Sequence, residues 1–358
     1  MKNAPQPIID AIRKMEVEPV KQNRNIDMLI GEDIAFSSKE DFSDRLPCEI
    51  DEWNRNGTSL VWVKVPSVSG KNTKIYMRWG RKTPAGNLPS SEVWSDYLGV
   101  YHMSKFDSER KTTPDSSPHA RHAVLVSRGE DSPTPTVTLV EGAQGKVGKA
   151  IKVEDGLLEI ASPTSFPDKY DDMPLHFSVS VWLRLEYDTY DGWRDQLGHF
   201  DNLTPEGSTT KYRYGWMFQN DSAKNYSALY YGKNGSSGRN IKAWWKVSET
   251  EWHHRVVSSN GYLISPYSDG TKYISETYKN EKTDDGIPHK GGADIGGIDK
   301  PISIGGKTMT QVTDEVRISR SVLSDDRVKA DYGMMVNESF AVCSPAELLI
   351  DGFKITVR

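Results

Sequence analysis

Residues 311–330 read Gln311-Val-Thr-Asp-Glu-Val-Arg-Ile-Ser-Arg-Ser-Val-Leu-Ser-Asp-Asp-Arg-Val-Lys-Ala330. The alternation of side chains over residues 314–318 predicts a β-strand in which Val316 and Ile318 share one face. After a turn, Ser324 is a typical N-cap residue, and the acidic residues that follow it suit the first turn of a helix. A strand that closes a sheet and leads into a capping helix typically ends a domain. We therefore expect a domain boundary soon after this stretch.

The size and composition of the chain favour two domains rich in β-structure. Its 358 residues exceed the usual length of one domain. Tryptophan and tyrosine number 10 and 16 in a chain that is only 36% hydrophobic, which suits β-sandwiches. The net charge is −5 and no basic run is interleaved with aromatic residues, so nucleic acid is not an expected partner. No apolar run reaches the roughly 18 residues that span a bilayer, so we expect no membrane insertion by this chain.

The two cysteines, Cys48 and Cys343, lie far apart in the sequence. They exclude a disulfide scaffold, and neither has the spacing of a metal-ligand motif. Two interpretations stay open for them: two unpaired buried thiols, or one bridge that ties the N-terminal domain to the C-terminal tail.

Short strands separated by turns divide the chain. Residues 177–185 alternate most clearly, with Phe177, Val179 and Val181 on one face. Residues 8–15 form a short amphipathic helix at best. About a dozen strands without interior helices predict an all-β fold, a two-sheet jelly-roll sandwich with a smaller N-terminal β-domain. The expected parts are a linker or short helix over 1–30, a small β-domain over 31–82, a linker over 83–93, the jelly roll over 94–333, and C-terminal strands over 334–358 that pack on the N-terminal domain.

Six motifs occur along the chain in this order: Tyr97-Leu-Gly-Val-Tyr-His-Met, Asp115-Ser-Ser-Pro-His-Ala-Arg-His-Ala, Gly145-Lys-Val-Gly-Lys-Ala-Ile, Phe177-Ser-Val-Ser-Val-Trp, Glu251-Trp-His-His-Arg-Val and Thr313-Asp-Glu-Val-Arg-Ile-Ser. In this order they resemble the laminin-G-like jelly rolls of the concanavalin A-like lectin/glucanase superfamily, over roughly residues 94–333. Residues 46–79 look like a small uncharacterised β-domain that commonly precedes such jelly rolls in bacterial envelope proteins. The resemblance implies an exported bacterial protein, extracellular, on the cell surface or periplasmic, of which this chain is an excerpt without the signal sequence. It does not imply one ligand, because the superfamily hosts lectins, adhesion modules and glycosidases alike.

The acidic residues do not predict catalysis. A retaining glycosidase needs two carboxylates about 5 Å apart. In the glucanases of this superfamily they lie two and four residues apart on one strand, where alternate residues share a face. Asp314 and Glu315 are adjacent, so we expect them on opposite faces. We therefore expect no enzyme activity.

Metal sites have weak support in the sequence. The tandem His253-His254 does not predict one, because adjacent strand residues point to opposite faces; one ring is expected in the core and one at the surface. Jelly rolls of this kind often carry a structural Ca²⁺, for which Asp115 and Asp314 are the candidate ligands. The alternative for both is an ordinary hydrogen-bonding role. No cofactor is expected to be required.

Aromatic residues concentrate between Tyr187 and Trp245. Sugar rings stack on aromatic rings while Arg and amide groups bind the hydroxyls, so this composition suits a glycan site, and it also suits a protein-interaction surface. The competing interpretation is that most of these rings fill the core. Trp193, in a polar loop, is the aromatic residue least explained by packing. The candidate ligand-binding residues are Trp193, Tyr212, Tyr214, Trp216, Tyr230, Trp244 and Arg213.

The function that these observations favour is a non-catalytic carbohydrate-binding or adhesion module of a bacterial cell-surface or envelope protein. Its expected partner is a glycan or a cell-surface protein. The alternative is a structural or protein-interaction module with no small ligand, and a glycoside hydrolase comes third. Neither the ligand nor the oligomeric state follows from the sequence.

Overall fold

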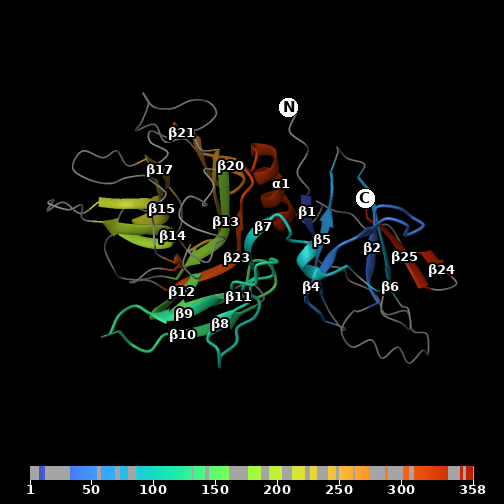
Figure 1. Ribbon diagram of the computed structural model, residues 1–358, viewed down its shortest axis with the longest axis horizontal. Helices are drawn as coiled ribbons and strands as arrows, with labels where there is room; N and C mark the ends of the chain where they lie inside the picture. Colours follow the sequence, from blue (N-terminus) through green and yellow to red (C-terminus); the bar gives the residue numbers. More distant parts are fainter. Residues whose placement is uncertain are drawn as a thin grey trace. The chain divides into compact units, whose positions relative to one another are not determined.

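The computed structural model describes residues 8–12, 33–54, 58–68, 73–79, 86, 88–130, 132–141, 145–160, 176–186, 193–203, 212–221, 226–231, 241–246, 250–260, 263–273, 287–288, 301–305, 310–337, 347–349 and 352–357. The chain forms two compact units (Figure 1). The first unit joins Met1–Ser95 to Ala330–Arg358, and the second unit is Asp96–Lys329. No helix among the described residues is long and apolar enough to cross a membrane.

The second unit is a sandwich of two antiparallel sheets. The nine-stranded sheet has the order β10-β11-β23-β13-β18-β19-β20, with β7 beside β23 and β21 beside β19. Its strands are β7 (Tyr97–Tyr101), β10 (Thr136–Val140), β11 (Ala150–Glu154), β13 (His176–Leu185), β18 (His253–Asn260), β19 (Leu263–Ser268), β20 (Thr271–Lys272), β21 (Ile287–Pro288) and β23 (Gln311–Ser319). The eight-stranded sheet has the order β17-β16-β15-β14-β22-β12-β9-β8. Its strands are β8 (Thr112–Thr113), β9 (Ala123–Ser127), β12 (Gly156–Ile160), β14 (Trp193–Leu203), β15 (Tyr212–Asp221), β16 (Tyr226–Tyr231), β17 (Ile241–Lys246) and β22 (Ile302–Ile304).

The core of the second unit lies between these two sheets. The alternation predicted for residues 177–185 is confirmed, because Phe177, Val179 and Val181 of β13 are all buried in this core. The eight-stranded sheet contributes Trp216 and Phe218 from the opposite side. Each such side chain contributes about 1.5–3 kcal/mol through its removal from water. The described strands therefore form the expected jelly-roll sandwich.

Strand β23 holds the nine-stranded sheet together. One edge pairs with β13, and the other edge pairs first with β11 and then with β7. Val316 and Ile318 lie in the core, as predicted, and the strand extends beyond the predicted residues 314–318 at both ends. The register with β13 shifts between Ser180 and Trp182, and Glu315 has a φ of 48°. This combination is a β-bulge, which the sequence did not predict.

The helix that follows β23 is α1 (Asp325–Val336). The predicted N-cap is confirmed, because the Arg327 N–H donates to Ser324 Oγ at 3.2 Å. Val328 is buried against Val256 and Tyr267 of the nine-stranded sheet. The cap fixes where the helix begins, and this apolar contact holds its first turns on the sheet.

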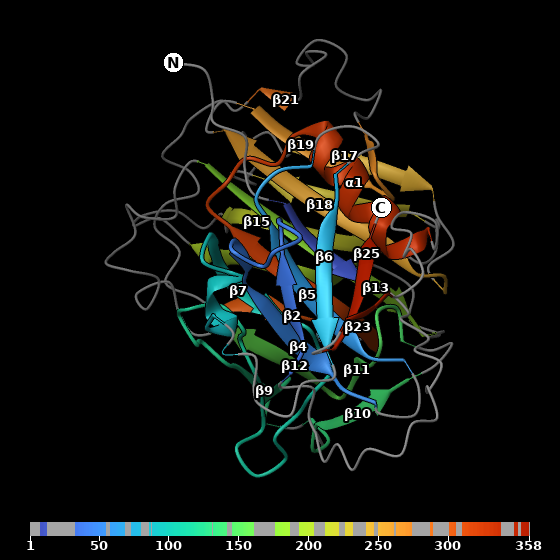
Figure 2. The ribbon, with the colours of Figure 1, turned by 90° about the vertical axis from the view of Figure 1, so that its right-hand side faces the viewer.

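The first unit is also built from strands. Its three-stranded sheet has the order β1-β5-β4, and its five-stranded sheet has the order β24-β25-β6-β2-β3. Figure 2 shows β25, β6 and β2 of the larger sheet beside one another. The elements are β1 (Ile8–Ile12), β2 (Ala35–Ser37), β3 (Arg45–Leu46), β4 (Cys48–Glu52), β5 (Leu60–Val65), β6 (Ile75–Trp79), the 3₁₀ helix η2 (Ser90–Glu92), β24 (Glu347–Leu349) and β25 (Gly352–Val357). Residues 8–12 are a strand paired with β5, so the prediction of a linker or short helix is wrong there. The C-terminal strand β25 pairs with β6, so this unit contains both ends of the chain.

Cys48 lies in the core of the first unit, beside Val61 and Val63 of β5. Burial raises the pKa of its thiol to about 11. Cys343 lies outside the described residues, so a bridge between the two cysteines stays a prediction. The buried, protonated thiol of Cys48 is the form that packs as a small apolar side chain.

Candidate functional site

The seven candidate ligand-binding residues all lie on β14, β15, β16 and β17. These strands are neighbours in the eight-stranded sheet, where β17 is the last described strand at one end. Trp193 pairs with Asp221, Tyr230 with Met217 and Trp244 with Ala228. Residues 212–214 pair with 203–201 of β14. Positions spread over about fifty residues of sequence are thereby gathered into one region of a single sheet.

Trp216 does not belong to an exposed ligand surface, so its place among the candidates is corrected. Its side chain is 0% exposed, and its ring centroid lies 6.0 Å from that of Phe177 and 6.4 Å from that of Phe218. Alternation along β15 places Trp216 on the same face as Phe218, and that face is turned to the other sheet. Trp216 is a core residue. The side chains of the other six candidates lie outside the described part of the chain.

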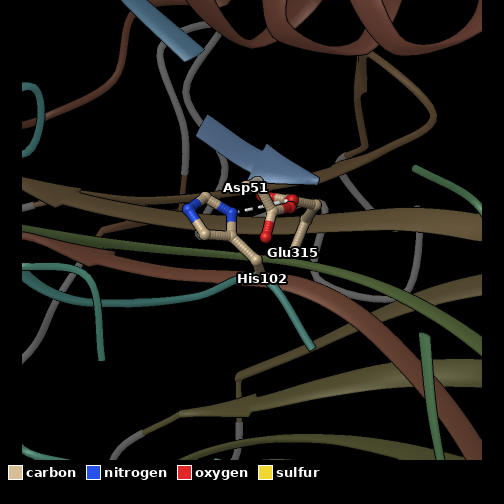
Figure 3. A group of neighbouring side chains, drawn as sticks. All are labelled: Asp51, His102 and Glu315. Atoms are coloured by element: carbon tan, nitrogen blue, oxygen red, sulfur yellow. Dashed lines mark hydrogen bonds and ion pairs between the residues drawn. The ribbon is translucent and has the colours of Figure 1, made fainter. Parts of the chain in front are cut away.

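A buried ionic network lies on the nine-stranded sheet, and sequence reasoning missed it. Arg317 Nη2 and Nε donate to Glu315 Oε2 at 2.7 and 3.1 Å. His102, just after β7, lies with its Nδ1 2.9 Å from Glu315 Oε1 (Figure 3). The side chains of Glu315, Arg317 and His102 are 0%, 4% and 5% exposed. We call these three residues the β23 charge network. The i, i+2 spacing of Glu315 and Arg317 on one strand was the signal available in the sequence.

The bulge in β23 overturns the prediction that Asp314 and Glu315 point to opposite faces. Asp314 pairs with Trp182, and Arg317 pairs with Ser180. Ser180 and Trp182 both contact His254, so they lie on one face of the sheet, and their partners share it. The carboxylate of Glu315 reaches Arg317 on this same face. The extra residue in the bulge explains why simple alternation failed here.

Both acids are held by donors within the second unit. Glu315 binds Arg317 and His102, and Asp314 Oδ2 accepts the backbone N–H groups of Lys146 and Val147 at 3.1 and 2.7 Å. His102 and Glu315 offer two ligand atoms, which is fewer than the three or four protein ligands of a zinc site. Asp51, which Figure 3 also labels, belongs to the first unit. Within the second unit, the described contacts of this network indicate a structural role.

The tandem histidines have separate partners. His254 is 1% exposed, stacks on Trp182 at 5.0 Å between centroids, and has its Nε2 2.8 Å from Ser180 Oγ. His253 is partly buried and bonds through Nδ1 to Asp269 Oδ2 at 2.8 Å. The two rings therefore point apart, as strand geometry requires, and they do not share a ligand.

Two of these groups have strongly shifted pKa values. Burial lowers the pKa of His254 to about 3, with Asp269 opposing the change and Arg317 adding to it. For the Asp269 carboxyl, burial acts to raise the pKa. The hydrogen bond to His253 and the nearby Arg255 outweigh it and lower the pKa to about 2. His254 is neutral and Asp269 ionised near neutral pH.

The free energy of unfolding is expected to decrease steadily as the pH is lowered below about 6.5. In the unfolded chain His254 takes up a proton near pH 6.5, whereas in the folded protein it stays neutral down to about pH 3. This difference costs about 2 kcal/mol at pH 5. The stabilisation by ionised Asp269 is complete above pH 3.8 and is lost as the pH falls through about 2. Urea unfolding at several pH values measures the slope of the free energy of unfolding against pH.

The variant His254→Gln is expected to flatten this slope between pH 6.5 and 4. His119→Gln is the matched control: burial lowers the pKa of this histidine too, but far less than that of His254, so the variant is expected to flatten the slope only slightly. An unchanged slope in His254→Gln would show that this histidine does not control the acid sensitivity.

The candidate calcium ligands hold backbone in place. The Asp115 carboxylate accepts the N–H groups of Val100, Ser117 and Arg121 at 2.8–2.9 Å, and the Ser117 hydroxyl at 2.8 Å. These bonds tie residues 115–121 to β7. Calcium at Asp115 and Asp314 remains a prediction. A rise in melting temperature on adding Ca²⁺ that Asp115→Asn abolishes would establish it.

The comparison with family models agrees with the jelly-roll fold of the second unit. Residues 160–329 match the model of the concanavalin A-like lectin/glucanases superfamily. This match covers most of the second unit, which we call the concanavalin A-like domain from here on. Residues 30–114 match the model of a domain of unknown function (DUF2341). A comparison with curated protein sequences gives no match.

Several solved structures are similar at low sequence identity. The binding domain of Paraclostridial Mosquitocidal Protein 1 is 14% identical, with a TM-score of 0.43, over 69% of this chain and 53% of that one. Domain 4 of AbnA, a GH43 extracellular arabinanase from Geobacillus stearothermophilus in complex with arabinotriose, is 14% identical, with a TM-score of 0.41, over 67% and 98%. The binding domain of botulinum neurotoxin serotype D is 11% identical, with a TM-score of 0.40, over 66% and 50%. The matches span about half the length of the two toxin binding domains.

Proposed function

We propose that the concanavalin A-like domain is a non-catalytic glycan-binding module of an exported bacterial protein that acts outside the cell, on its surface or in the periplasm. The observation that carries the proposal is the gathering of Trp193, Tyr230 and Trp244, with Arg213, on four neighbouring strands of one sheet. The superfamily, described by its lectins and glucanases, is consistent with a saccharide ligand.

The chemistry of these residue types suits a sugar. An aromatic ring offers an apolar face to the C–H groups of a pyranose, and a guanidinium offers five N–H donors to hydroxyl or carboxylate oxygens. Ligand sites commonly combine such apolar surfaces with a few polar groups that fix orientation. The pairing of β14 to β17 in one sheet sets the backbone positions of these residues relative to one another, which lowers the ordering cost of binding.

A non-catalytic role is supported by the state of the acids on β23. A retaining glycosidase needs two carboxylates about 5 Å apart that face the substrate, one as nucleophile and one as acid. Glu315 is buried and bonded to Arg317, and Asp314 is buried and bonded to backbone N–H groups. Neither carboxylate offers the exposed, substrate-facing oxygen that this chemistry requires.

The test is binding of the full chain to a glycan array, followed by titration of the strongest ligand. Trp193→Ala and Trp244→Ala are each expected to weaken binding about 30-fold, the effect of an aromatic contact of about 2 kcal/mol. Tyr273→Ala is the matched control: it removes an aromatic side chain that is 38% exposed and follows the other sheet, and it is expected to leave affinity unchanged. Far-UV circular dichroism checks that each variant folds.

Three results would contradict the proposal. Full affinity in both tryptophan variants would place the ligand elsewhere. No glycan binding, together with a stable complex with a cell-surface protein, would favour the protein-interaction module. Release of new reducing ends from a polysaccharide would contradict the absence of catalysis.

A further inference from the structure

Strand β10 forms an open edge of the nine-stranded sheet. It pairs with β11 on one side, and it is the last strand in the sheet order among the described residues. Both ribbon views place it near the lower end of the second unit (Figures 1 and 2). Its sequence is Thr136-Val-Thr-Leu-Val140, which contains no charged residue. Uncharged edge strands of this kind readily pair with a strand of another chain.

The other described edges of this unit are protected against such pairing. At the outer edge of β7, the Val100 N–H donates to Asp115 Oδ1 and the Ser116 N–H donates to Val100 O, both at 2.8 Å, so a loop covers this strand. Strands β8, β20 and β21 have only two residues each. The sequence of β17 contains Lys242 and Lys246, and lysine on an edge strand opposes pairing. Among the described edges of this unit, β10 is the one that has none of these features within the strand.

The side of β10 that is turned to the core is apolar and only partly covered. Val137 and Leu139 pair with Val153 and Ile151 of β11, which lie in the core. Val137 packs against this core, whereas Leu139 is 41% exposed. Because strand residues alternate, Thr138 lies on the opposite face, where it is exposed. A further strand beside β10 would therefore cover apolar surface as well as satisfy backbone groups.

The sequence of β10 is complementary to a second copy of itself. Pro135 has no N–H to donate and the strand ends at Val140, so the stretch available for pairing is centred on Thr138. In an antiparallel pair with this centre, the two Thr138 residues lie opposite each other. Val137 of each copy then lies opposite Leu139 of the other copy, on the core side, and no charged residue of one strand faces the other strand. One two-fold symmetric arrangement thus pairs both edges at once.

We propose that two copies of this chain associate through antiparallel pairing of their β10 strands, which joins their two nine-stranded sheets into one continuous sheet. A single strand pair is smaller than the roughly 800 Å² per partner of a standard interface, so we expect a weak dimer with a Kd of about 1–100 µM. One consequence rests on the proposed function: a dimer carries two glycan sites, which raises its apparent affinity for a surface that displays many glycans.

The test is sedimentation velocity of the full chain at concentrations between about 1 and 200 µM. We expect a shift from monomer to dimer as the concentration rises. Thr138→Lys places two ammonium groups directly opposite each other, so it is expected to weaken the dimer about 5- to 10-fold. The exposed position of Thr138 makes a loss of folding unexpected, and far-UV circular dichroism checks this. Addition of the Thr138→Glu chain to a labelled Thr138→Lys chain is expected to restore a dimer, because opposite charges then face each other.

The matched control is Val124→Lys. Val124 is an apolar side chain that is 39% exposed, but its strand, β9, pairs with β8 and β12 on its two sides and has no open edge. This variant introduces the same charge on the same unit and is expected to leave the dimer unchanged.

Disulfide trapping tests the register of the pair. In a Cys343→Ser background, Thr138→Cys is expected to give a covalent dimer under mild oxidation. Residues opposite each other in an antiparallel pair have Cα atoms about 4.5–5.5 Å apart, which lies within the range of a disulfide. Thr136→Cys is expected to give no covalent dimer, because the opposite residue is Val140 of the second copy. The native Cys48 is buried in the core of the first unit.

Three results would overturn the proposal: a chain that stays monomeric up to about 200 µM, a dimer that Thr138→Lys leaves unchanged, or equal cross-linking of Thr136→Cys and Thr138→Cys. A monomeric chain that instead pairs an extended segment of another protein along β10 would also overturn it. The affinity of Thr138→Lys for a single soluble glycan is expected to equal that of the unmodified chain. Failure of the dimer and failure of the proposed glycan site are therefore seen in different measurements.

Discussion

Replacement of Trp216 by alanine is expected to lower the free energy of unfolding by about 3–5 kcal/mol. The indole is fully buried between the two sheets, against Phe177 and Phe218. Its removal leaves a cavity that cannot collapse, because hydrogen bonds to β14 and β16 hold β15 in place on both sides. Urea titration followed by far-UV circular dichroism measures the change.

The more conservative Trp216→Phe is the control for this prediction. It keeps an aromatic ring in the core, so it is expected to cost less than half as much and to leave glycan affinity unchanged. A decrease of less than about 1 kcal/mol in the free energy of unfolding of Trp216→Ala would contradict the core role of Trp216. A specific loss of glycan binding in a stable Trp216→Phe protein would show that Trp216 belongs to the ligand site.

The second large effect is expected at the β23 charge network. Glu315→Ala leaves the buried Arg317 guanidinium without the carboxylate that accepts from its Nε and Nη2. Removal of one partner of a buried ion pair costs about 3–5 kcal/mol, because the other charge is left in a medium of low polarity. Urea unfolding of the full chain at neutral pH measures this loss.

A double variant separates the ion pair from the rest of the site. Glu315→Ala combined with Arg317→Met removes both charges, so it is expected to recover most of the stability lost in Glu315→Ala. The matching single variant Arg317→Met completes the cycle. If the effects of the two single changes simply add, the pair is not coupled and the network does not stabilise β23 in the way described.

Local patterns in the sequence were sufficient to predict the elements that are determined by residues close together in the chain. Ser324 predicted the start of α1, because an N-cap side chain bonds to the backbone only three residues away. The alternation over residues 177–185 predicted which side of β13 faces the core, because no bulge among the core residues 177–183 breaks their period of two. Six motifs in order indicated a concanavalin A-like jelly roll, and the family match agrees.

Features decided by distant strands were not predictable in the same way. The bulge at Glu315 depends on how β23 aligns with β13, which lies more than a hundred residues earlier. The pattern over residues 8–15 was interpreted as a short amphipathic helix at best, but pairing with β5 makes residues 8–12 a strand. A tryptophan such as Trp216 suits a core and a sugar site equally, and only the packing of the two sheets shows that it lies in the core.

For the candidate site, the sequence predicted which residues take part but not which strands lie beside one another. The sequence located the aromatic residues, and the sheet order shows that their strands are neighbours. Which strands pair is a property of the whole fold, so spacing alone does not reveal this gathering. The β23 charge network was missed because its third member, His102, directly follows β7, far from Glu315 in sequence.

Hydrogen–deuterium exchange, with and without the strongest glycan from the array, tests directly whether the glycan binds on β14 to β17. Binding slows exchange of the backbone amides that the ligand covers or orders. We expect new protection in peptides that contain 193–203, 212–221, 226–231 and 241–246, with peptides of β13 and β23 unchanged. Protection confined to other strands, or no protection at a glycan concentration that saturates the array signal, would contradict a binding site on β14 to β17.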